Sequence, residues 1–298
     1  MAKFLVEKSG PLRGEVVISG AKNAVLPILA ATLLSKENCE IDEVPDLKDV
    51  QVLCSLLASL GAEVDKHIEE NFVKVKAERI LTSHASEELM KMMRASILVM
   101  GPLLARTGKA IVNLPGGCAI GERPVELHFK GFKALGAKVE IQPNGMVIAT
   151  ADSLKGANVY LDFPSVGATE NIMMAAALAE GTTIIENAAQ EPEIVDLANF
   201  INKMGGHIRG AGTDTIKIEG VETLHGTSHS VIPDRIEAGT FMVATAITRG
   251  SILIRNVLPQ HIKPIIAKLR ECGVEIYYND EEGLLVRADV NPLISTEM

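Results

Sequence analysis

A glycine turn, Leu60-Gly61-Ala62-Glu63-Val64, recurs three more times along this chain. The other three turns follow at intervals of 68 to 75 residues and read Leu135-Gly136-Ala137-Lys138-Val139, Met204-Gly205-Gly206-His207-Ile208 and Cys272-Gly273-Val274-Glu275-Ile276. A glycine directly after an amphipathic helix is typical of a left-handed cap, where a Cβ would clash. The four turns therefore predict four copies of a unit in which a helix, a glycine turn and a strand follow one another.

Each copy also contains a second helix, made of small residues and followed by a β-rich segment. We predict these helices at residues 24–34, 95–105, 172–179 and 238–247, and the segments at 39–44, 109–114, 182–186 and 251–256. The helices are rich in Ala and Met and carry almost no charge, so we expect them to be buried on all sides. The sequence thus predicts an α/β fold in which sheets surround interior helices.

The composition of the 298 residues excludes several classes of protein. Hydrophobic residues make up 47% and charged residues 22%, which is typical of a packed globular chain. Aromatic residues make up only 3% and the net charge is −9, so we expect neither nucleic-acid nor membrane partners. The four cysteines show no metal-ligand spacing, which predicts no metal site, and scattered thiols fit a cytoplasmic protein.

The most unusual part of the chain reads Leu114-Pro115-Gly116-Gly117-Cys118-Ala119-Ile120-Gly121-Glu122-Arg123-Pro124. Its three glycines and two prolines exclude regular structure and predict a shaped loop. A lone cysteine is more often a small buried hydrophobic residue than a reactive one. In this loop, however, Arg123 would favour the thiolate of Cys118, so a reactive cysteine is the competing interpretation.

Polar and cationic residues stand where the predicted small-residue helices begin. In chain order they are Lys22 and Asn23, then Arg94, then Ser165-Val166-Gly167-Ala168-Thr169, then Asp234, Arg235 and Glu237. Helix N-termini attract anions through their free N–H groups and the helix dipole. A single cation at such a position is usually a solvated surface charge. Because these residues recur at equivalent positions of the repeat, we favour an anion-binding cleft.

Two further features carry weaker signals. The acidic run Glu191-Pro192-Glu193-Ile194-Val195-Asp196 predicts a helix N-terminus whose dipole matches the acidic side chains. His128 follows the glycine-rich loop, and both a substrate contact and a structural role are open for it.

These segments together resemble the UDP-N-acetylglucosamine 1-carboxyvinyltransferases, a family of enolpyruvyl transferases. The matching segments span nearly the whole chain and comprise residues 20–24, 115–128, 165–169, 191–196 and 233–237. The most specific of them places Cys118 within the sequence PGGCAIGERP, because the sister shikimate-pathway transferases lack this loop cysteine.

The resemblance implies an inside-out α/β barrel fold, built from βαβαββ units with three units per domain. Residues 22–232 would form one complete domain that carries the loop 114–124. Residues 1–21 and 233–298 would form an incomplete partner, because chains of the family continue with further units that include an aspartate accepting the sugar proton. We therefore expect a C-terminally truncated enzyme with little turnover. The alternative is a non-catalytic sugar-nucleotide-binding fragment, with Asp234 or Glu191 as replacement bases if turnover is normal.

The implied reaction moves enolpyruvyl from phosphoenolpyruvate to the 3-hydroxyl of UDP-N-acetylglucosamine and releases phosphate, at the first committed step of peptidoglycan precursor synthesis. It needs no metal and no cofactor, and Cys118 would act as an acid that can form a covalent adduct. The resemblance further implies a cytoplasmic enzyme that is a monomer when complete and a target of fosfomycin. Phosphoenolpyruvate would be held by Lys22, Asn23 and Arg123. The residues implied for the sugar nucleotide are Arg94, Arg123, Pro124, Val125, Glu126, Leu127, Ser165, Val166 and Gly167.

Overall fold

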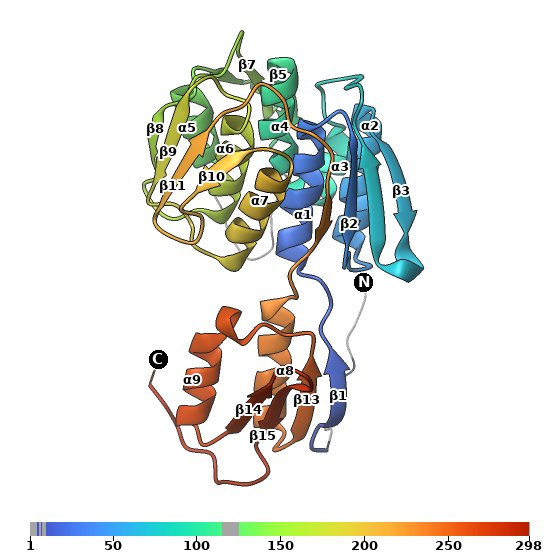
Figure 1. Cartoon of the computed structure of the whole chain (residues 1–298), viewed down its shortest axis with the longest axis vertical. Coiled ribbons are helices and arrows are strands. Elements are labelled where there is room, and N and C mark those ends of the chain that lie inside the picture. The colour runs from blue at the N-terminus through green and yellow to red at the C-terminus, as the bar shows by residue number, and fades with distance from the viewer. Residues whose placement is uncertain (1–4, 6, 8–9, 115–124, 298) are drawn as a thin grey trace. The chain divides into compact units, whose positions relative to one another are not determined.

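The computed structural model describes residues 5, 7, 10–114 and 125–297. The chain forms two compact units (Figure 1). The large unit is Lys22–Ile232, and the small unit combines Met1–Ala21 with Pro233–Met298. The N-terminal segment thus packs with the C-terminal segment, although the whole large unit separates them in the sequence.

All four sheets follow one topology. A central strand pairs with an antiparallel strand that forms a hairpin with the edge strand, and in three sheets a short strand adds in parallel on the other side. The large unit has β12-β2-β4-β3 (Ser228–Ser230, Asn38–Asp42, Phe72–Lys76, Glu63–His67), β8-β9-β11-β10 (Asn158–Tyr160, Thr182–Glu186, Thr215–Glu219, His207–Arg209) and β5-β7-β6 (Lys109–Asn113, Met146–Thr150, Lys138–Ile141). The small unit has β1-β13-β15-β14 (Arg13–Val17, Ser251–Arg255, Gly283–Arg287, Glu275–Asn279). In the β5 sheet, a single parallel bridge from His84 to Ile111 takes the place of the short strand.

Two of the short strands connect parts of the chain that are far apart in sequence. Strand β12 follows the third copy of the repeat but pairs with β2 of the first copy, with Ser228 opposite Glu40. Strand β1 precedes the large unit but pairs with β13 of the fourth copy, with Arg13 opposite Ser251. These pairings join the first and third copies within the large unit, and they hold the N-terminal segment in the small unit.

Helices of two kinds fill the large unit. The small-residue helices α1 (Lys22–Ala31), α4 (Met100–Thr107) and α6 (Val166–Ala176) lie in its interior with the strands around them, and α4 contacts α6 (Figure 1). Residues 24–31 of α1 and 168–176 of α6 are all buried, which confirms the expected burial for these two helices. For the helix predicted at 238–247 the expected burial on all sides is wrong, because Val243 and Ile247 are exposed. The other helices are α2 (Lys48–Leu60), α3 (Glu87–Met92), α5 (Glu126–Ala134) and α7 (Pro192–Lys203).

The helices predicted at 24–34 and 238–247 begin two and three residues earlier in the structure, and the other two copies differ more. The helix expected at 95–105 is divided into a 3₁₀ helix, Arg94–Val99, and α4. Pro102 explains this division, because it has no N–H to donate and is therefore tolerated only in the first turn of a helix. It lies in the first turn of α4. The helix expected at 172–179 begins earlier, at Val166, because Ser165 caps it, and it ends at Ala176.

The glycine turns are confirmed as left-handed caps. The first glycines of the four turns have φ values of +108°, +93°, +97° and +90° and are Gly61, Gly136, Gly205 and Gly273. At Gly61 an added Cβ would also lie 2.6 Å from the Leu81 side chain, so this position excludes other residues for two reasons.

The small unit has its own hydrophobic core beneath one sheet. Its helices are α8 (Arg235–Ile247) and α9 (Lys263–Glu271), and a 3₁₀ turn, Pro259–His261, lies between them. Met242 of α8 is fully buried, and Phe241 packs partly against the same core. Val243, the next residue of α8, is exposed.

Candidate functional site

The N-terminus of α6 is built from small residues, as the sequence predicts. The Ser165 side chain caps the helix by accepting a hydrogen bond from the N–H of Ala168, at 3.4 Å. The N–H groups of Val166 and Gly167 have no acceptor within the helix, because the first turn lacks preceding carbonyls. These half-buried residues therefore offer backbone donors and the positive end of the helix dipole to an anion.

The start of α5 lies beside this helix, since α5 and α6 are in contact. Val125 stands at its N-cap position, and the N–H of His128 donates to the carbonyl of Val125 at 3.0 Å. Val125 and Leu127 are buried, whereas Glu126 is exposed. Val125 and Leu127 can therefore reach a ligand chiefly through backbone atoms, while Glu126 can offer its side chain.

His128 connects α5 to α6. Its Nδ1 lies 3.0 Å from Nδ2 of Asn171, and its Nε2 would lie 3.6 Å from a Cβ added at Gly167. Burial, and secondarily the charge of Arg94, lower the pKa of His128 to about 4, so the imidazole is neutral at pH 7. The contact with Asn171 gives His128 a structural role through Nδ1.

Arg94 is the first residue of the 3₁₀ helix that precedes α4, and it is half-buried. Its charge acts on His128, whose ring lies beside Gly167. The structure thus brings together three of the predicted features, namely Arg94, the start of α5 and the start of α6.

Lys22 is the first residue of α1, and Asn23 beside it is exposed. The Nζ of Lys22 lies 3.2 Å from Oδ2 of Asp49, at the start of α2. This ion pair orients the ammonium group at the helix N-terminus. The predicted residues Cys118, Arg123 and Pro124 lie outside the described residues.

In the small unit, the acidic residues at the start of α8 have structural partners. Asp234 caps the helix by accepting hydrogen bonds from the N–H groups of Ile236 and Glu237, at 2.7 and 3.0 Å. Oε2 of Glu237 accepts from the hydroxyl of Ser19 at 2.6 Å and from its N–H at 3.0 Å. These contacts tie α8 to the segment that follows β1.

The acidic run 191–196 forms the predicted start of α7, with Glu191 at the N-cap position. Asp196 is buried and bonded to Nε2 of His229 at 2.9 Å and to the N–H of Ile232 at 3.2 Å. It therefore anchors β12 and the end of the large unit to α7.

Sequence reasoning missed two buried polar residues of α6. Asn171 is fully buried and bonded to three neighbours. Glu170 is 3% exposed, and among the described residues its Oε1 has no hydrogen-bond partner. Burial, together with the charges of Glu193 and Glu191, raises its pKa. The available signal was the polar run Thr169-Glu170-Asn171 in an otherwise apolar helix.

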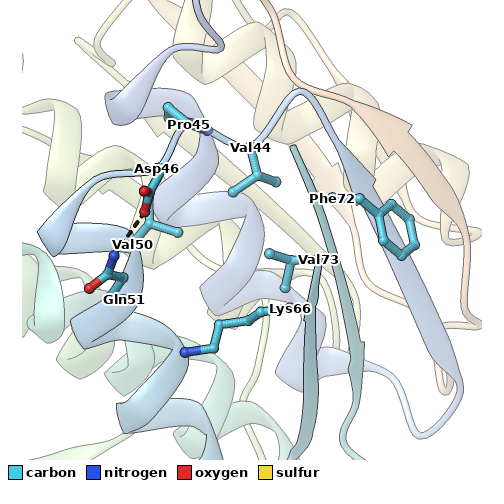
Figure 2. A pocket seen from close by; sticks show the side chains of 8 residues that line it. All are labelled: Val44, Pro45, Asp46, Val50, Gln51, Lys66, Phe72 and Val73. Carbon is cyan, nitrogen blue, oxygen red and sulfur yellow. Dashed lines mark hydrogen bonds between the residues drawn. The ribbon is translucent and has the colours of Figure 1, made fainter. Parts of the chain in front are cut away.

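A shallow hollow lies between α2 and the strands β3 and β4 (Figure 2). The hydrogen bond from Gln51 to Asp46, 2.8 Å long, crosses one side of it. Its lining is Val44, Pro45, Asp46, Val50, Gln51, Lys66, Phe72 and Val73, and it includes none of the predicted site residues.

Within the described part of the chain, no group of three or more His, Cys, Asp or Glu side chains could hold a metal ion. Over the same residues, no helix has the length and apolar character needed to cross a membrane.

Comparison with known proteins assigns the chain to a family. The family model of EPSP synthase (3-phosphoshikimate 1-carboxyvinyltransferase) matches residues 6–298. UDP-N-acetylglucosamine 1-carboxyvinyltransferase 1 of Caldanaerobacter subterraneus subsp. tengcongensis is 57% identical over 289 residues, which cover 97% of this chain and 68% of that protein. The chain belongs to the UDP-N-acetylglucosamine 1-carboxyvinyltransferase family.

A second member of the UDP-N-acetylglucosamine 1-carboxyvinyltransferase family, from Staphylococcus aureus (strain MRSA252), is 56% identical over 97% of this chain and 69% of its own length. The chain thus spans about two thirds of the length of these relatives. The resemblance to this family of transferases is confirmed, and these matches favour an enzyme over the non-catalytic alternative.

Solved structures confirm the fold class. The enolpyruvyl transferase NikO from Streptomyces tendae matches with a TM-score of 0.81 at 21% identity, over 93% of this chain and 66% of that one. EPSP synthase from Acinetobacter baumannii matches with a TM-score of 0.74 at 19% identity, over 98% of this chain and 68% of that one. The chain therefore has the α/β fold of the enolpyruvyl transferases.

Proposed function

We propose that this protein transfers enolpyruvyl from phosphoenolpyruvate to the 3-hydroxyl of UDP-N-acetylglucosamine, in the synthesis of peptidoglycan precursors. The observation that carries the proposal is the 57% identity, over 97% of the chain, to a transferase of that name. In the addition step, the hydroxyl oxygen bonds to C2 of phosphoenolpyruvate, the hydroxyl proton goes to a base, and C3 gains a proton. In the elimination step, C3 loses a proton and phosphate leaves C2.

For phosphoenolpyruvate, we propose that Lys22, Asn23 and Arg123 hold the substrate and that Cys118 acts as the acid and adduct-forming residue. The position of Lys22 at the N-terminus of α1 supports this role, because its ammonium and the helix dipole act on the same anion. Asp49 supports it as well, since its ion pair with Lys22 limits the directions in which the ammonium can point.

For the sugar nucleotide, we propose a site made by the helix starts that the structure brings together. The start of α6 would supply N–H groups to the diphosphate, and Arg94 would supply a charge beside them. The burial of Val125 and Leu127 supports backbone contacts from the start of α5. The full set is Arg94, Arg123, Pro124, Val125, Glu126, Leu127, Ser165, Val166 and Gly167.

A phosphate-release assay on the purified chain tests this proposal. We expect UDP-N-acetylglucosamine binding by calorimetry, together with slow phosphate release that requires both substrates. Lys22→Ala should weaken phosphoenolpyruvate binding by roughly tenfold or more, since a charge-assisted hydrogen bond contributes about 1.5–3 kcal/mol. Lys74→Ala, which breaks an ion pair with Glu40 on a sheet face outside the site, is the matched control. A chain that neither releases phosphate nor binds the sugar nucleotide contradicts the proposal.

We also propose that the two compact units are the two domains of the enzyme, with the loop 114–124 carried by the large one. The pairing of β12 with β2 and of β1 with β13 supports the boundaries. A cytoplasmic location fits the free thiols of Cys39, Cys54 and Cys272. Fosfomycin should label Cys118 and should fail to label Cys118→Asp, because a carboxylate is a poorer nucleophile toward an epoxide than a thiolate.

A further inference from the structure

Asn171 is buried in α6, and its side chain connects α6 to α4 and to the 3₁₀ helix Arg94–Val99 that precedes α4. Its Oδ1 accepts a hydrogen bond from the N–H of Gly101 at 2.7 Å, and its Nδ2 donates to the carbonyl of Ile97 at 2.9 Å. Because an N–H can only donate and a carbonyl can only accept, these two contacts determine which end of the amide carries the nitrogen.

The orientation of Asn171 determines the tautomer of His128. Nδ2 of Asn171 lies 3.0 Å from Nδ1 of His128, and Nδ2 can only donate. Nδ1 therefore accepts and carries no proton, so the neutral imidazole carries its proton on Nε2. An imidazolium would place an N–H at Nδ1 against the N–H of Asn171, and burial already lowers the pKa of His128 to about 4. The ring is therefore a neutral donor at its Nε2 edge.

This Nε2 edge lies at the start of α6. Nε2 and Cε1 would lie 3.6 and 3.4 Å from a Cβ added at Gly167, so Gly167 leaves room for the ring. His128 is 5% exposed, and its ring contacts Asn171 through Nδ1, which leaves Nε2 on the opposite side. The N–H groups of Val166 and Gly167 and the charge of Arg94 belong to the same neighbourhood. These groups are all donors, which suits an acceptor oxygen of a phosphate.

We propose that Asn171 is a positioning residue, which holds His128 as the Nε2–H tautomer and so keeps a neutral donor beside Gly167 for a phosphate oxygen of the bound sugar nucleotide. This inference rests on the proposed function, because it names a further contact to the same substrate. It assigns His128 both of the interpretations left open by the sequence, with a structural contact at Nδ1 and a substrate contact at Nε2.

Nitrogen NMR of the full chain, labelled with ¹⁵N-histidine, tests the tautomer without any ligand. At pH 7.5 we expect an unprotonated Nδ1 and a protonated Nε2 for His128. In Asn171→Asp the carboxylate accepts from the ring, so the proton should move to Nδ1. A protonated Nδ1 in the unaltered chain, or an unchanged tautomer in folded Asn171→Asp, overturns the proposal.

Two substitutions of His128 test the substrate contact and do not depend on whether Asn171→Asp folds. The amide of His128→Gln reaches the former Nε2 position, whereas the amide of His128→Asn reaches only the Nδ1 position. Calorimetry with UDP-N-acetylglucosamine should show binding about tenfold weaker for His128→Asn than for His128→Gln. His225→Asn, at an exposed loop position, controls for the loss of a histidine.

Equal affinities for the two His128 variants overturn the substrate contact. If the unaltered chain fails to bind UDP-N-acetylglucosamine, the proposed function fails, while the NMR result still decides whether Asn171 sets the tautomer. The two failures are therefore distinguishable.

Discussion

Helices α6 and α8 occupy the same position in the repeat, but their surroundings differ. In the large unit, residues 168–176 of α6 are all buried. In the small unit, α8 exposes one apolar stripe, with exposed fractions of 50% for Ile236, 51% for Val243 and 79% for Ile247. The spacing of these residues places them on one helix face.

This difference shows that the composition of a helix does not decide its burial by itself. In the large unit, which holds three copies, α6 contacts both α1 and α4, so the interior helices are covered by their neighbours. The small unit contains one copy, and α8 covers one face against α9 and the sheet. Exposed apolar stripes of this kind promote association between molecules.

The largest expected effect comes from placing a charge at equivalent positions of the two helices. Met174 and Val243 each stand nine residues after the N-cap residue, Ser165 and Asp234 respectively. Met174→Asp should reduce the free energy of unfolding of the large unit by about 3–5 kcal/mol, because it buries an unpaired carboxylate. Val243→Asp should change the free energy of unfolding of the small unit by no more than about 0.5 kcal/mol.

Urea unfolding followed by hydrogen exchange, which separates the two units, measures both values. Met174→Leu, which keeps the volume and the apolar character, controls for the loss of the methionine itself. Similar destabilisation by the two aspartates would mean that α8 is covered in solution, and the contrast between the helices would be lost.

The second expected effect is a loss of stability at acidic pH, and it should be confined to the large unit. His128 has a folded pKa of about 4 and an ordinary value of 6.5, so folding favours its neutral form. The resulting stability is fully present above pH 6.5 and is lost as the pH falls to 4. The expected loss is about 3 kcal/mol, because each pH unit between the two pKa values contributes about 1.4 kcal/mol.

Urea unfolding at pH 7, 5.5 and 4.5 tests this loss, with His128→Asn expected to have the flatter profile. Glu170 acts with the opposite sign, since its raised pKa favours the protonated form and adds stability as the pH falls. The chain with His128 and the His128→Asn variant should therefore both also carry Glu170→Gln, which removes the contribution of Glu170. Equal slopes for the two chains would show that protonation of His128 does not govern the acid response.

The comparison also shows which parts of the fold can be predicted from sequence. The glycine caps are predictable because only glycine readily adopts the left-handed backbone that Gly61 and Gly273 have. The small-residue helices are predictable as helices, but the exposed face of α8 is not, because composition does not show how many neighbours cover a helix. The pairing of β12 with β2 is not, since the three-residue strand Ser228–Ser230 has no local signal for a partner in the first copy.

The same limit applies to the candidate site. The start of α6 is predictable, because small residues after a capping serine are a local pattern. The role of Asn171 is not, because its partners Ile97, Gly101 and His128 come from other segments and meet it only in the folded chain. Sequence reasoning thus locates the helix ends but misses the side chains that orient them.

The smallest expected effect is on thiol reactivity. Burial raises the pKa of both Cys39 and Cys54, in the large unit, to about 11, whereas Cys272 of the small unit is half-buried. A rise from 9.0 to about 11 reduces the thiolate fraction about 100-fold at pH 8. We therefore expect iodoacetamide to alkylate Cys272 at least about 100-fold faster than the other two, as measured by peptide mapping in a Cys118→Asp background.

The pH dependence of alkylation sharpens this prediction. Labelling of Cys39 and Cys54 should rise steeply between pH 9 and 11, and the stability that folding gains from their neutral thiols should be lost over the same range, because their folded pKa values lie above the unfolded one. In urea all three thiols should react alike, which shows that the difference comes from folding. If Cys54 reacts as fast as Cys272 in the native chain, then local unfolding exposes Cys54 in α2 to the reagent as often as Cys272 at the end of α9. The large unit would then be no better packed than the small one.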